Sequence, residues 1–382
     1  MLSFWEKQSL LHYDMIIIGG GIVGLSTAMA IKEKAPKTRV LVLERGVLPT
    51  GASTKNAGFA CTGSLTEIID DLRIMKEDEL LQLVALRQKG LQKLRKRLGD
   101  DKIGYAENGS WELINNSPEQ TGAIGRIDEV NEKLKSVLGE KAFEAFTYSN
   151  KKADFGFDEN NVKYIVRNNF EGELNSGMMM RALIDLCLTS GIEIKTGCEV
   201  STIEEEQNTV NVIVKHNYLN EEISFSASKL GVCTNAFTRQ LYPELDIKPG
   251  RGQVLITEPI PGLRFKGIYH FDKGYYYFRR LGDSVLFGGG RNIDFAGEET
   301  TLFEFNEKIR ADLTDKLQHI ILPGVKFKIA DWWTGIMAFA DTKFPILKQH
   351  SNRVSLAVRM GGMGVAMGSE IGENLAEMML DI

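Results

Sequence analysis

Three glycines near the start of the chain have the spacing that lets a backbone surround a dinucleotide phosphate. Gly19, Gly21 and Gly24 form G-x-G-x-x-G directly after an apolar run at 14–18, which predicts a buried strand. The first glycine permits a tight turn, the second lets the backbone approach a pyrophosphate, and the third lets helix and strand pack closely. The helix that begins here would also direct free N–H groups and a positive dipole end at the phosphates.

An acidic residue closes the next predicted strand, at 39–44. Glu44 lies about twenty residues beyond the last of the three glycines, where a carboxylate accepts hydrogen bonds from ribose hydroxyls. The same carboxylate disfavours a 2′-phosphate, so we do not expect NADP. The strand, the glycine turn, the helix and Glu44 together predict a βαβ dinucleotide-binding unit, but they do not distinguish FAD from NAD.

The loop after this unit distinguishes the two cofactors. Residues 51–58 are G-A-S-T-K-N-A-G. At this point the chain resembles the D-amino acid oxidase (DAO) family of flavoproteins, which includes glycine oxidase, sarcosine oxidase and γ-glutamylputrescine oxidase-like enzymes and carries G-A-S-x-x-N-x-G here. The resemblance implies non-covalently bound FAD. It places Ser53 and Thr54 at phosphate or ribityl oxygens and residues 55–58 at the edge of the flavin ring.

The end of the chain resembles the same family. Residues 331–347, D-W-W-T-G-I-M-A-F-A-D-T-K-F-P-I-L, precede a predicted strand at 354–358, a turn R-M-G-G-M-G and a final helix at 366–380. The glycines of this turn would leave N–H groups free at a helix start, which can hold the negative charge that builds at flavin N1 and C2=O during reduction. The residues expected at FAD are Gly19, Gly21, Ile22, Val23, Gly24, Glu44, Arg45, Ala52, Ser53, Thr54, Asn56, Ala57, Gly58, Val200, Thr234, Gly335, Arg359, Gly361, Gly362, Met363, Gly364 and Val365.

The substrate end of the expected site is less clearly marked. Amino-acid oxidases of the family hold the substrate carboxylate with an arginine in a G-x-R-P segment, and Met337 occupies the arginine position here. This difference argues against an α-amino acid held in that way, and the pattern is most similar to the γ-glutamylputrescine oxidase-like branch. Tyr276 alternates with two neighbouring tyrosines on a predicted strand and so faces away from both. The residues expected to act on the substrate are Tyr276, Arg251, Met337 and Trp333.

The resemblance implies an FAD-dependent oxidoreductase that transfers a hydride from an amine or amino acid carbon to flavin N5, giving an imine that hydrolyses. The sarcosine oxidase branch carries a lysine, linked to oxygen use, in the strand that matches 284–290, where this chain has S-V-L-F-G-G-G. The absence of this lysine argues against oxygen as the electron acceptor, and the sequence does not identify the acceptor. Two alternative functions are an FAD-dependent dehydrogenase of a 2-hydroxy acid or polyol, and a flavin-binding subunit without catalytic activity.

The composition is that of a globular protein that acts on small molecules. The 382 residues are 43% hydrophobic and 25% charged with a formal net charge of -5, and this mild acidity argues against a nucleic-acid partner. The four cysteines lack metal-ligand spacing, so we expect no metal and a reduced, cytoplasmic setting. The apolar stretch at 15–31 is too short and too interrupted to span a membrane. The expected partner is an amine or amino acid substrate, and a homo-oligomer stays open.

The elements that must position these residues predict an α/β protein. We expect a Rossmann-like FAD-binding domain with a parallel central sheet, interrupted by a second α+β domain with a mostly antiparallel sheet. The FAD-binding domain would be discontinuous, at 12–100, 160–245 and 330–382, and the substrate domain would comprise 101–159 and 246–329.

Local patterns refine this expectation within the second domain. Asn-Gly at 108–109 predicts a hairpin over 104–114. Amphipathic patterns predict helices at 118–138 and 302–319. Alternating Tyr, Phe and Val residues at 252–291 predict antiparallel strands.

Overall fold

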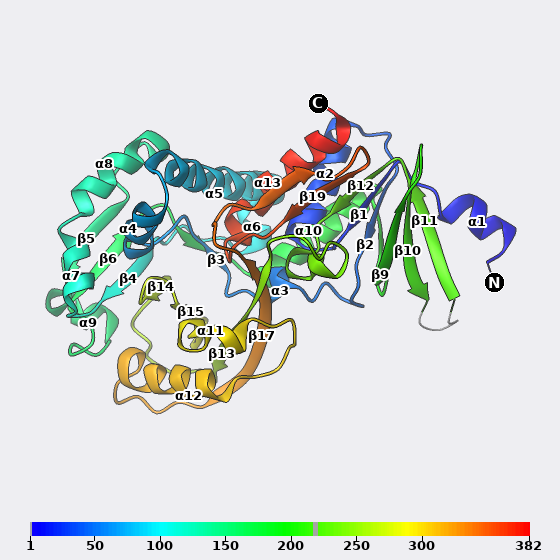
Figure 1. The fold of residues 1–382 in the computed structure, drawn as a ribbon. Coiled ribbons are helices and arrows are strands. Elements are labelled where there is room, and N and C mark those ends of the chain that lie inside the picture. Colours follow the sequence, from blue (N-terminus) through cyan, green and yellow to red (C-terminus); the bar gives the residue numbers. More distant parts are fainter. Residues whose placement is uncertain (1, 217–220) are drawn as a thin grey trace.

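The computed structural model describes residues 2–216 and 221–382, which form two large sheets with helices packed around them (Figure 1). The first sheet has six strands in the order β18-β19-β12-β1-β2-β8. Neighbouring strands are parallel except β18, which runs antiparallel to β19. The strands are β1 (Met15–Ile18), β2 (Val40–Leu43), β8 (Glu193–Lys195), β12 (Lys229–Val232), β18 (Ile346–Gln349) and β19 (Val354–Val358).

Helices cover one face of this sheet and a small antiparallel sheet covers the other. Alternate residues of β1 and β2 belong to two different hydrophobic cores, as expected for apolar strands between two layers. The helices are α2 (Ile22–Lys34), α5 (Glu77–Leu98), α10 (Ser176–Thr189) and α13 (Gly364–Leu380). The strands of the small sheet are β9 (Val200–Glu205), β10 (Val210–His216) and β11 (Glu221–Ala227).

The last helix, α13, brings the end of the chain back to the N-terminal βαβ unit. Gly372 of α13 allows close packing on α2, because a Cβ there would lie 2.7 Å from the Cβ of Ser26. The strands β1 and β19 are parallel, with β12 between them. The turns that follow β1 and β19 therefore lie at the same edge of the sheet, which is where ligands of parallel sheets bind.

The second sheet has eight strands in the order β17-β13-β16-β15-β14-β4-β6-β5. Its neighbours are antiparallel except β14 and β4. One face packs against an aromatic-rich core shared with the helix α12 (Glu307–Lys316). The strands are β4 (Ser110–Ile114), β5 (Phe143–Thr147), β6 (Tyr164–Asn168), β13 (Lys248–Thr257), β14 (Ile268–Phe271), β15 (Tyr276–Leu281), β16 (Ser284–Gly289) and β17 (Ile329–Phe339).

Further helices, turns and two short strands complete the fold. Among the described residues, none of the helices combines the length and the apolar character needed to cross a membrane. The remaining helices are α1 (Phe4–Leu10), α3 (Ala52–Lys55), α4 (Leu65–Ile74), α6 (Asp100–Ile103), α7 (Pro118–Ile124), α8 (Ile127–Leu138), α9 (Lys152–Phe155), α11 (Phe295–Glu298) and the turns η1 (Tyr148–Asn150), η2 (Asn235–Gln240), η3 (Arg291–Ile293) and η4 (Leu317–Ile321). The remaining strands are β3 (Phe59–Ala60) and β7 (Gly172–Glu173).

The predicted fold class is confirmed, but the predicted hairpin is wrong. β4 begins only at Ser110 and pairs with β6 and β14 rather than with residues 104–109. Gly109, with φ +72°, turns the chain into β4, and a Cβ there would lie 2.8 Å from the carbonyl oxygen of Asn168. The Asn-Gly pair thus makes a turn whose partner strand is distant in the sequence.

The two predicted helices of this region are only partly right. The helix expected at 118–138 is divided into α7 and α8, because the chain leaves helical geometry at Arg126 (φ -101°, ψ 0°). The helix expected at 302–319 begins at Glu307, where the side chain of Asn306 caps it by accepting a hydrogen bond from the N–H of Lys308.

The division into two domains stays a prediction. β6 and β17 belong to the eight-stranded sheet, although the predicted ranges 160–245 and 330–382 assign both to the FAD-binding domain. β17 runs from the outer end of the second sheet towards the first, where β18 and β19 follow it (Figure 1).

Candidate active site

One cavity of about 740 Å³ lies between the edge of the six-stranded sheet and one face of the eight-stranded sheet. Small-molecule sites typically enclose roughly 300–1,000 Å³. Gly19 and Gly21 line this cavity, and so do Gly361 and Gly362. The structure therefore brings the glycine turns from opposite ends of the chain to a single cavity.

The first glycine turn has no room for side chains. Gly19 has φ +111°, and a Cβ there would lie 2.6 Å from a carbonyl oxygen. A Cβ on Gly24 would lie 2.0 Å from the carbonyl oxygen of Gly19. Ser53, from the loop after β2, accepts a hydrogen bond from the N–H of Ile22 at 2.9 Å. The conformation of the turn is therefore fixed by close backbone packing and by the hydroxyl group of Ser53.

The same turn keeps several donors free. Three of its N–H groups make no hydrogen bond within the described residues; they belong to Gly21, Val23 and Gly24. Because these groups lie at the N-terminus of α2, they can donate hydrogen bonds to the negatively charged oxygens of a pyrophosphate.

Glu44 stands at the end of β2 with its carboxylate fixed by the backbone. Its Oε2 accepts a hydrogen bond from the N–H of Gly20 at 2.9 Å, and its Oε1 accepts one from the N–H of Gly46 at 2.9 Å. An ionised carboxylate can accept about four hydrogen bonds. Glu44, which lines the cavity, therefore keeps acceptor capacity for ribose hydroxyls.

The second glycine turn follows β19 and is hydrogen-bonded to the start of η2, which follows β12. Its residues with positive φ are Arg359, Gly361 and Gly362. The side-chain oxygen of Asn235 accepts hydrogen bonds from the N–H groups of Arg359 at 3.0 Å and Met360 at 3.3 Å. The N–H groups without a hydrogen bond within the described residues are those of Gly362, Gly364 and Val365. They form a donor set at the start of α13 that suits a developing negative charge.

The loop between these turns packs against β17. The amide nitrogen of Asn56 donates to the carbonyl oxygen of Ser53 at 2.8 Å, and its amide oxygen accepts from the N–H of Gly58 at 2.9 Å. The indole nitrogen of Trp333 on β17 donates to the carbonyl oxygen of Lys55 at 2.9 Å. These bonds fix the loop that the sequence predicts at the flavin edge.

Strand alternation decides which side chains of the eight-stranded sheet reach the cavity. On β13, Gly252 and Val254 line the cavity, whereas the side chain of Arg251 points to the opposite face and pairs with Glu298. Tyr275 and Tyr277 line the cavity, whereas Tyr276 packs in the aromatic core behind the sheet. The sequence predicts this alternation but not which of its two faces is the cavity face.

Most residues expected at FAD lie on the cavity wall. They are Gly19, Gly21, Ile22, Val23, Glu44, Arg45, Ala52, Ser53, Asn56, Ala57, Val200, Thr234, Gly335, Gly361, Gly362, Met363, Gly364 and Val365, together with Met337 from the expected substrate residues. The expected residues that do not line the cavity are Gly24, Thr54, Gly58, Arg359, Tyr276, Arg251 and Trp333. The roles of the first set stay predictions.

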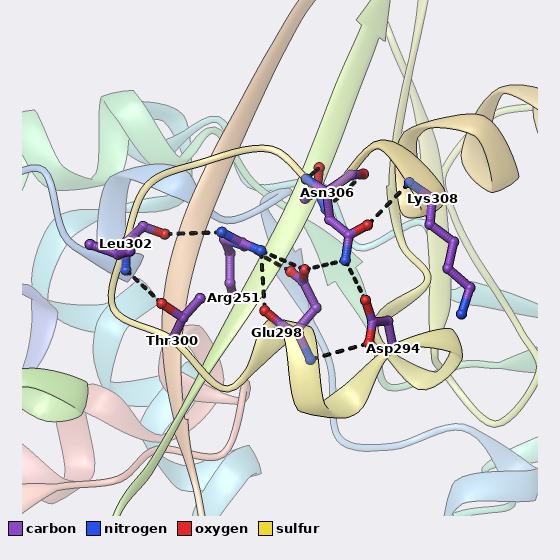
Figure 2. A network of polar contacts seen from close by, with 9 residues as sticks. Arg251, Asp294, Glu298, Thr300, Leu302, Asn306 and Lys308 are labelled. Carbon is purple, nitrogen blue, oxygen red and sulfur yellow. Dashed lines mark hydrogen bonds and ion pairs between the residues drawn. The ribbon is translucent and has the colours of Figure 1, made fainter.

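The polar groups among the residues away from the wall are bonded elsewhere. The guanidinium of Arg251 donates to both carboxylate oxygens of Glu298, at 2.7 and 3.0 Å, in a buried network (Figure 2). The hydroxyl of Tyr276 donates to Asp312 at 2.7 Å. The guanidinium of Arg359 donates to the carbonyl oxygen of Asp246 at 2.9 Å. These side chains stabilise the walls rather than reach into the cavity.

Two polar side chains on the wall, Cys61 and His270, were marked by no motif. Cys61 Sγ lies 3.5 Å from His270 Nε2, and Glu171 Oε2 lies 3.7 Å from the same nitrogen. Burial raises the pKa of Cys61, and the charge of Glu171 raises it further, so the thiol stays protonated. The ligand atoms of the three residues lie within 4.8 Å of one another, and the expected absence of a metal stays a prediction.

A buried charge network borders the cavity where the loop after β17 meets α4. Lys343 Nζ lies 3.0 Å from Glu67 and 2.7 Å from Asp71. Arg87 lies 3.4 Å from Glu67. Burial alone would raise the pKa of Glu67, but the charges of Lys343 and Arg87 lower it to about 2. The four-residue spacing of Glu67 and Asp71 on one helix face is the signal from which the sequence could have predicted this cluster.

The donors of the two turns and the cavity that joins them fit a cofactor with phosphates at one end and a reactive ring at the other. This architecture, with Glu44 at the end of β2, defines a flavin-dinucleotide-dependent oxidoreductase. Residues 14–378 match the model of the DAO family, described as FAD dependent oxidoreductase. The chain belongs to this family.

Similar proteins differ widely in sequence. A putative bifunctional amine oxidase of Dictyostelium discoideum is 26% identical over 255 residues, which are 63% of this chain and 21% of that protein. The L-proline dehydrogenase of P. horikoshii and the glycine oxidase of Geobacillus kaustophilus each have 18% identity and a TM-score of 0.77. Each comparison covers 97% of this chain, with 94% and 95% of the other chains respectively. This chain spans between about a fifth and about half of the length of the curated relatives it matches.

Proposed function

We propose that the chain oxidises the carbon next to the nitrogen of an amine or amino acid, with FAD as the hydride acceptor. The observation that carries this proposal is the continuous cavity, which runs from the two donor-rich turns to a wall of side chains on the eight-stranded sheet. By their names, the similar proteins act on an amine, proline or glycine. No observation on the described residues favours oxidation of a hydroxy acid or a role without catalysis.

The protein's contribution to this reaction is to bind, orient and exclude water. When bound, FAD supplies the hydride acceptor, and the imine that leaves is hydrolysed by water. The free N–H groups at the start of α13 would stabilise negative charge on the reduced ring, because they are positioned before the reaction begins. Glu44 and the first glycine turn would fix the adenosine and pyrophosphate end.

Tyr277 and Met337 would form the wall that faces the substrate. A Cβ on Gly252, between them, would lie 2.9 Å from Met337 Cε and 3.8 Å from the hydroxyl of Tyr277. Burial raises the pKa of Tyr277 to about 12, so the phenol is neutral at physiological pH and can donate a hydrogen bond. The apolar surroundings strengthen any such bond by keeping water away.

We further propose a cytoplasmic setting and a small-molecule substrate. The four cysteines are free thiols in the described structure, and three of them are buried. As in the sequence analysis, neither the electron acceptor nor the oligomeric state is assigned.

The proposal is tested by purifying the protein and recording its visible spectrum. We expect flavin absorbance bands that bleach when amines or amino acids are added without oxygen. A protein that stays colourless and takes up no added FAD would contradict the cofactor assignment. Bleaching by 2-hydroxy acids but not by amines would contradict amine oxidation, and reoxidation by oxygen or by a dye would identify the class of acceptor.

A further inference from the structure

Three side chains that can bind a metal ion meet at the cavity, although they come from separate elements of the fold. Cys61 follows β3, Glu171 precedes β7, and His270 lies on β14. Cys61 Sγ lies 3.5 Å from His270 Nε2, and Glu171 Oε2 lies 3.7 Å from the same nitrogen. The three ligand atoms all lie within 4.8 Å of one another. Cys61 and His270 line the cavity, whereas Glu171 is fully buried.

The separations of these atoms fit a tetrahedral metal site. Zn²⁺ binds thiolate sulfur at about 2.3 Å, imidazole nitrogen at about 2.0–2.1 Å and carboxylate oxygen at about 2.0–2.2 Å. In a tetrahedron these bond lengths place neighbouring ligand atoms roughly 3.4–3.6 Å apart. The observed distances of 3.5 and 3.7 Å lie close to this range. The three side chains can therefore supply three of the four ligands of one ion with small adjustments.

The carboxylate of Glu171 is fixed through one oxygen and keeps the other available. Its Oε1 accepts hydrogen bonds from the N–H groups of Thr62 at 2.7 Å and Gly63 at 2.8 Å. Its Oε2 is buried and makes no hydrogen bond within the described residues. Burial raises the pKa of the carboxyl group, but His270, Ser110 and the N–H of Gly63 hold it below its usual range. Buried charged groups are generally paired or coordinate a metal, so this free oxygen indicates a missing cation.

The positive charges nearby are already paired with other acidic residues. Arg87 and Lys343 both form ion pairs with carboxylates of α4. Within the part of the chain that the structure describes, the ion-pair partner of Glu171 is His270, which is charged only if protonated. The thiolate of Cys61 and the carboxylate of Glu171 would together carry two negative charges. A divalent ion would balance both of them.

We propose that Cys61, Glu171 and His270 bind a divalent transition-metal ion with the ligand preferences of Zn²⁺. Such ions take thiolate, imidazole and carboxylate ligands together, whereas Mg²⁺ and Ca²⁺ prefer oxygen. Binding forms one bond from each side chain to the ion and releases the proton of the Cys61 thiol to water. The fourth ligand position would face the cavity, because Cys61 and His270 line it. This proposal replaces the expectation of no metal, which rested on spacing along the chain alone.

The proposal is tested by measuring Zn²⁺ binding to the FAD-loaded protein. The protein is freed of metal with a chelator, loaded with ZnCl₂ and dialysed, and its metal content is measured by inductively coupled plasma mass spectrometry. We expect a stoichiometric amount of Zn²⁺ in the unmodified protein. Competition with a fluorescent chelator should show at least about 100-fold weaker binding in Cys61→Ser, because losing even a group that supports a ligand costs roughly 10–100-fold.

The matched control is Cys198→Ser. Cys198 lines the same cavity but belongs to no cluster of metal-binding side chains among the described residues. A second variant, Glu171→Gln, keeps an oxygen for the N–H groups of Thr62 and Gly63 and should weaken Zn²⁺ binding at least about tenfold. Loading with Co²⁺ adds a spectroscopic readout. We expect a thiolate-to-Co²⁺ charge-transfer band in the unmodified protein and in Cys198→Ser, and no such band in Cys61→Ser.

Three outcomes would overturn the proposal. The unmodified protein retains no stoichiometric Zn²⁺ after dialysis, Cys61→Ser and Cys198→Ser bind Zn²⁺ equally well, or bound Co²⁺ gives no thiolate band. If circular dichroism shows that Cys61→Ser does not fold, an unchanged Zn²⁺ affinity in Glu171→Gln overturns the proposal instead. None of these measurements uses turnover, so they decide the metal site whether or not the protein oxidises amines.

Discussion

The two walls of the cavity are built in different ways. The wall at the edge of the six-stranded sheet presents free main-chain N–H groups of two glycine turns, together with the carboxylate of Glu44, which two backbone N–H groups hold in place. The wall on the eight-stranded sheet consists of side chains from several strands, including His270, Tyr277 and Met337. A backbone site follows from local spacing, because each residue's role depends on its immediate neighbours in the chain. A side-chain site depends on which face of a sheet meets the cavity.

The largest expected effect breaks the network behind the side-chain wall. Arg251→Met should lower the free energy of unfolding by about 3–5 kcal/mol, because it leaves the buried carboxylate of Glu298 without its partner. Denaturant unfolding monitored by circular dichroism measures this change. The double variant Arg251→Met/Glu298→Met should recover much of the loss, since no buried charge is left unpaired. A stable Arg251→Met variant with only its turnover reduced would instead place Arg251 at the substrate.

The next prediction breaks the backbone wall. Gly24→Ala should weaken FAD binding about 100-fold, or ~2.8 kcal/mol, because the new Cβ would lie 2.0 Å from the carbonyl oxygen of Gly19 and would displace the turn. Titration of the protein with FAD, followed by flavin fluorescence, measures the affinity. Gly122→Ala in α7 is the matched control, because a Cβ there meets nothing within 4 Å. Equal FAD affinity in both variants would contradict the account of the turn.

A smaller effect is expected at Glu44, the carboxylate that backbone N–H groups hold in place. Glu44→Ala should weaken FAD binding by about 1–3 kcal/mol, through the loss of hydrogen bonds to an ionised acceptor. The same FAD titration measures the change. The FAD affinity of Glu44→Gln should lie between those of Glu44→Ala and the unmodified protein, because glutamine keeps a neutral acceptor. An unchanged affinity in Glu44→Ala would mean that the ribose is held by other groups.

The smallest expected effect separates the two faces of β15. Tyr276→Phe should lower the free energy of unfolding by about 1 kcal/mol, because it removes the bond to Asp312, and it should leave kcat/KM nearly unchanged. Tyr277→Phe should lower kcat/KM by a factor equivalent to about 1 kcal/mol and leave the free energy of unfolding nearly unchanged. Steady-state kinetics and thermal unfolding of both variants test this pair. The reverse pattern would show that the cavity lies on the other face of the strand.

The comparison of the two walls also explains how far the sequence could predict the site. The turn at Gly19 and its acidic partner Glu44 were predicted because spacing alone defines them, and their positions at the cavity follow from the fold. Arg251 and Tyr276 were expected at the substrate, but each points away, since a one-residue difference on a strand reverses the side chain.

The fold shows the same difference between features that local sequence defines and features that depend on distant parts of the chain. The βαβ unit was predicted from local patterns, whereas the hairpin at 104–114 failed because β4 pairs with β14, which is far away in the sequence. Long-range pairing of this kind leaves no local signal in a single sequence.

The central claim is that one FAD molecule connects the turn at Gly19 with the turn at Gly361. A crystal structure of the purified yellow protein tests this most directly. The account predicts electron density for the pyrophosphate over the N-terminus of α2 and for the flavin ring between Met337 and the start of α13. Density for the cofactor elsewhere, or side chains that fill the space between the two turns, would contradict it.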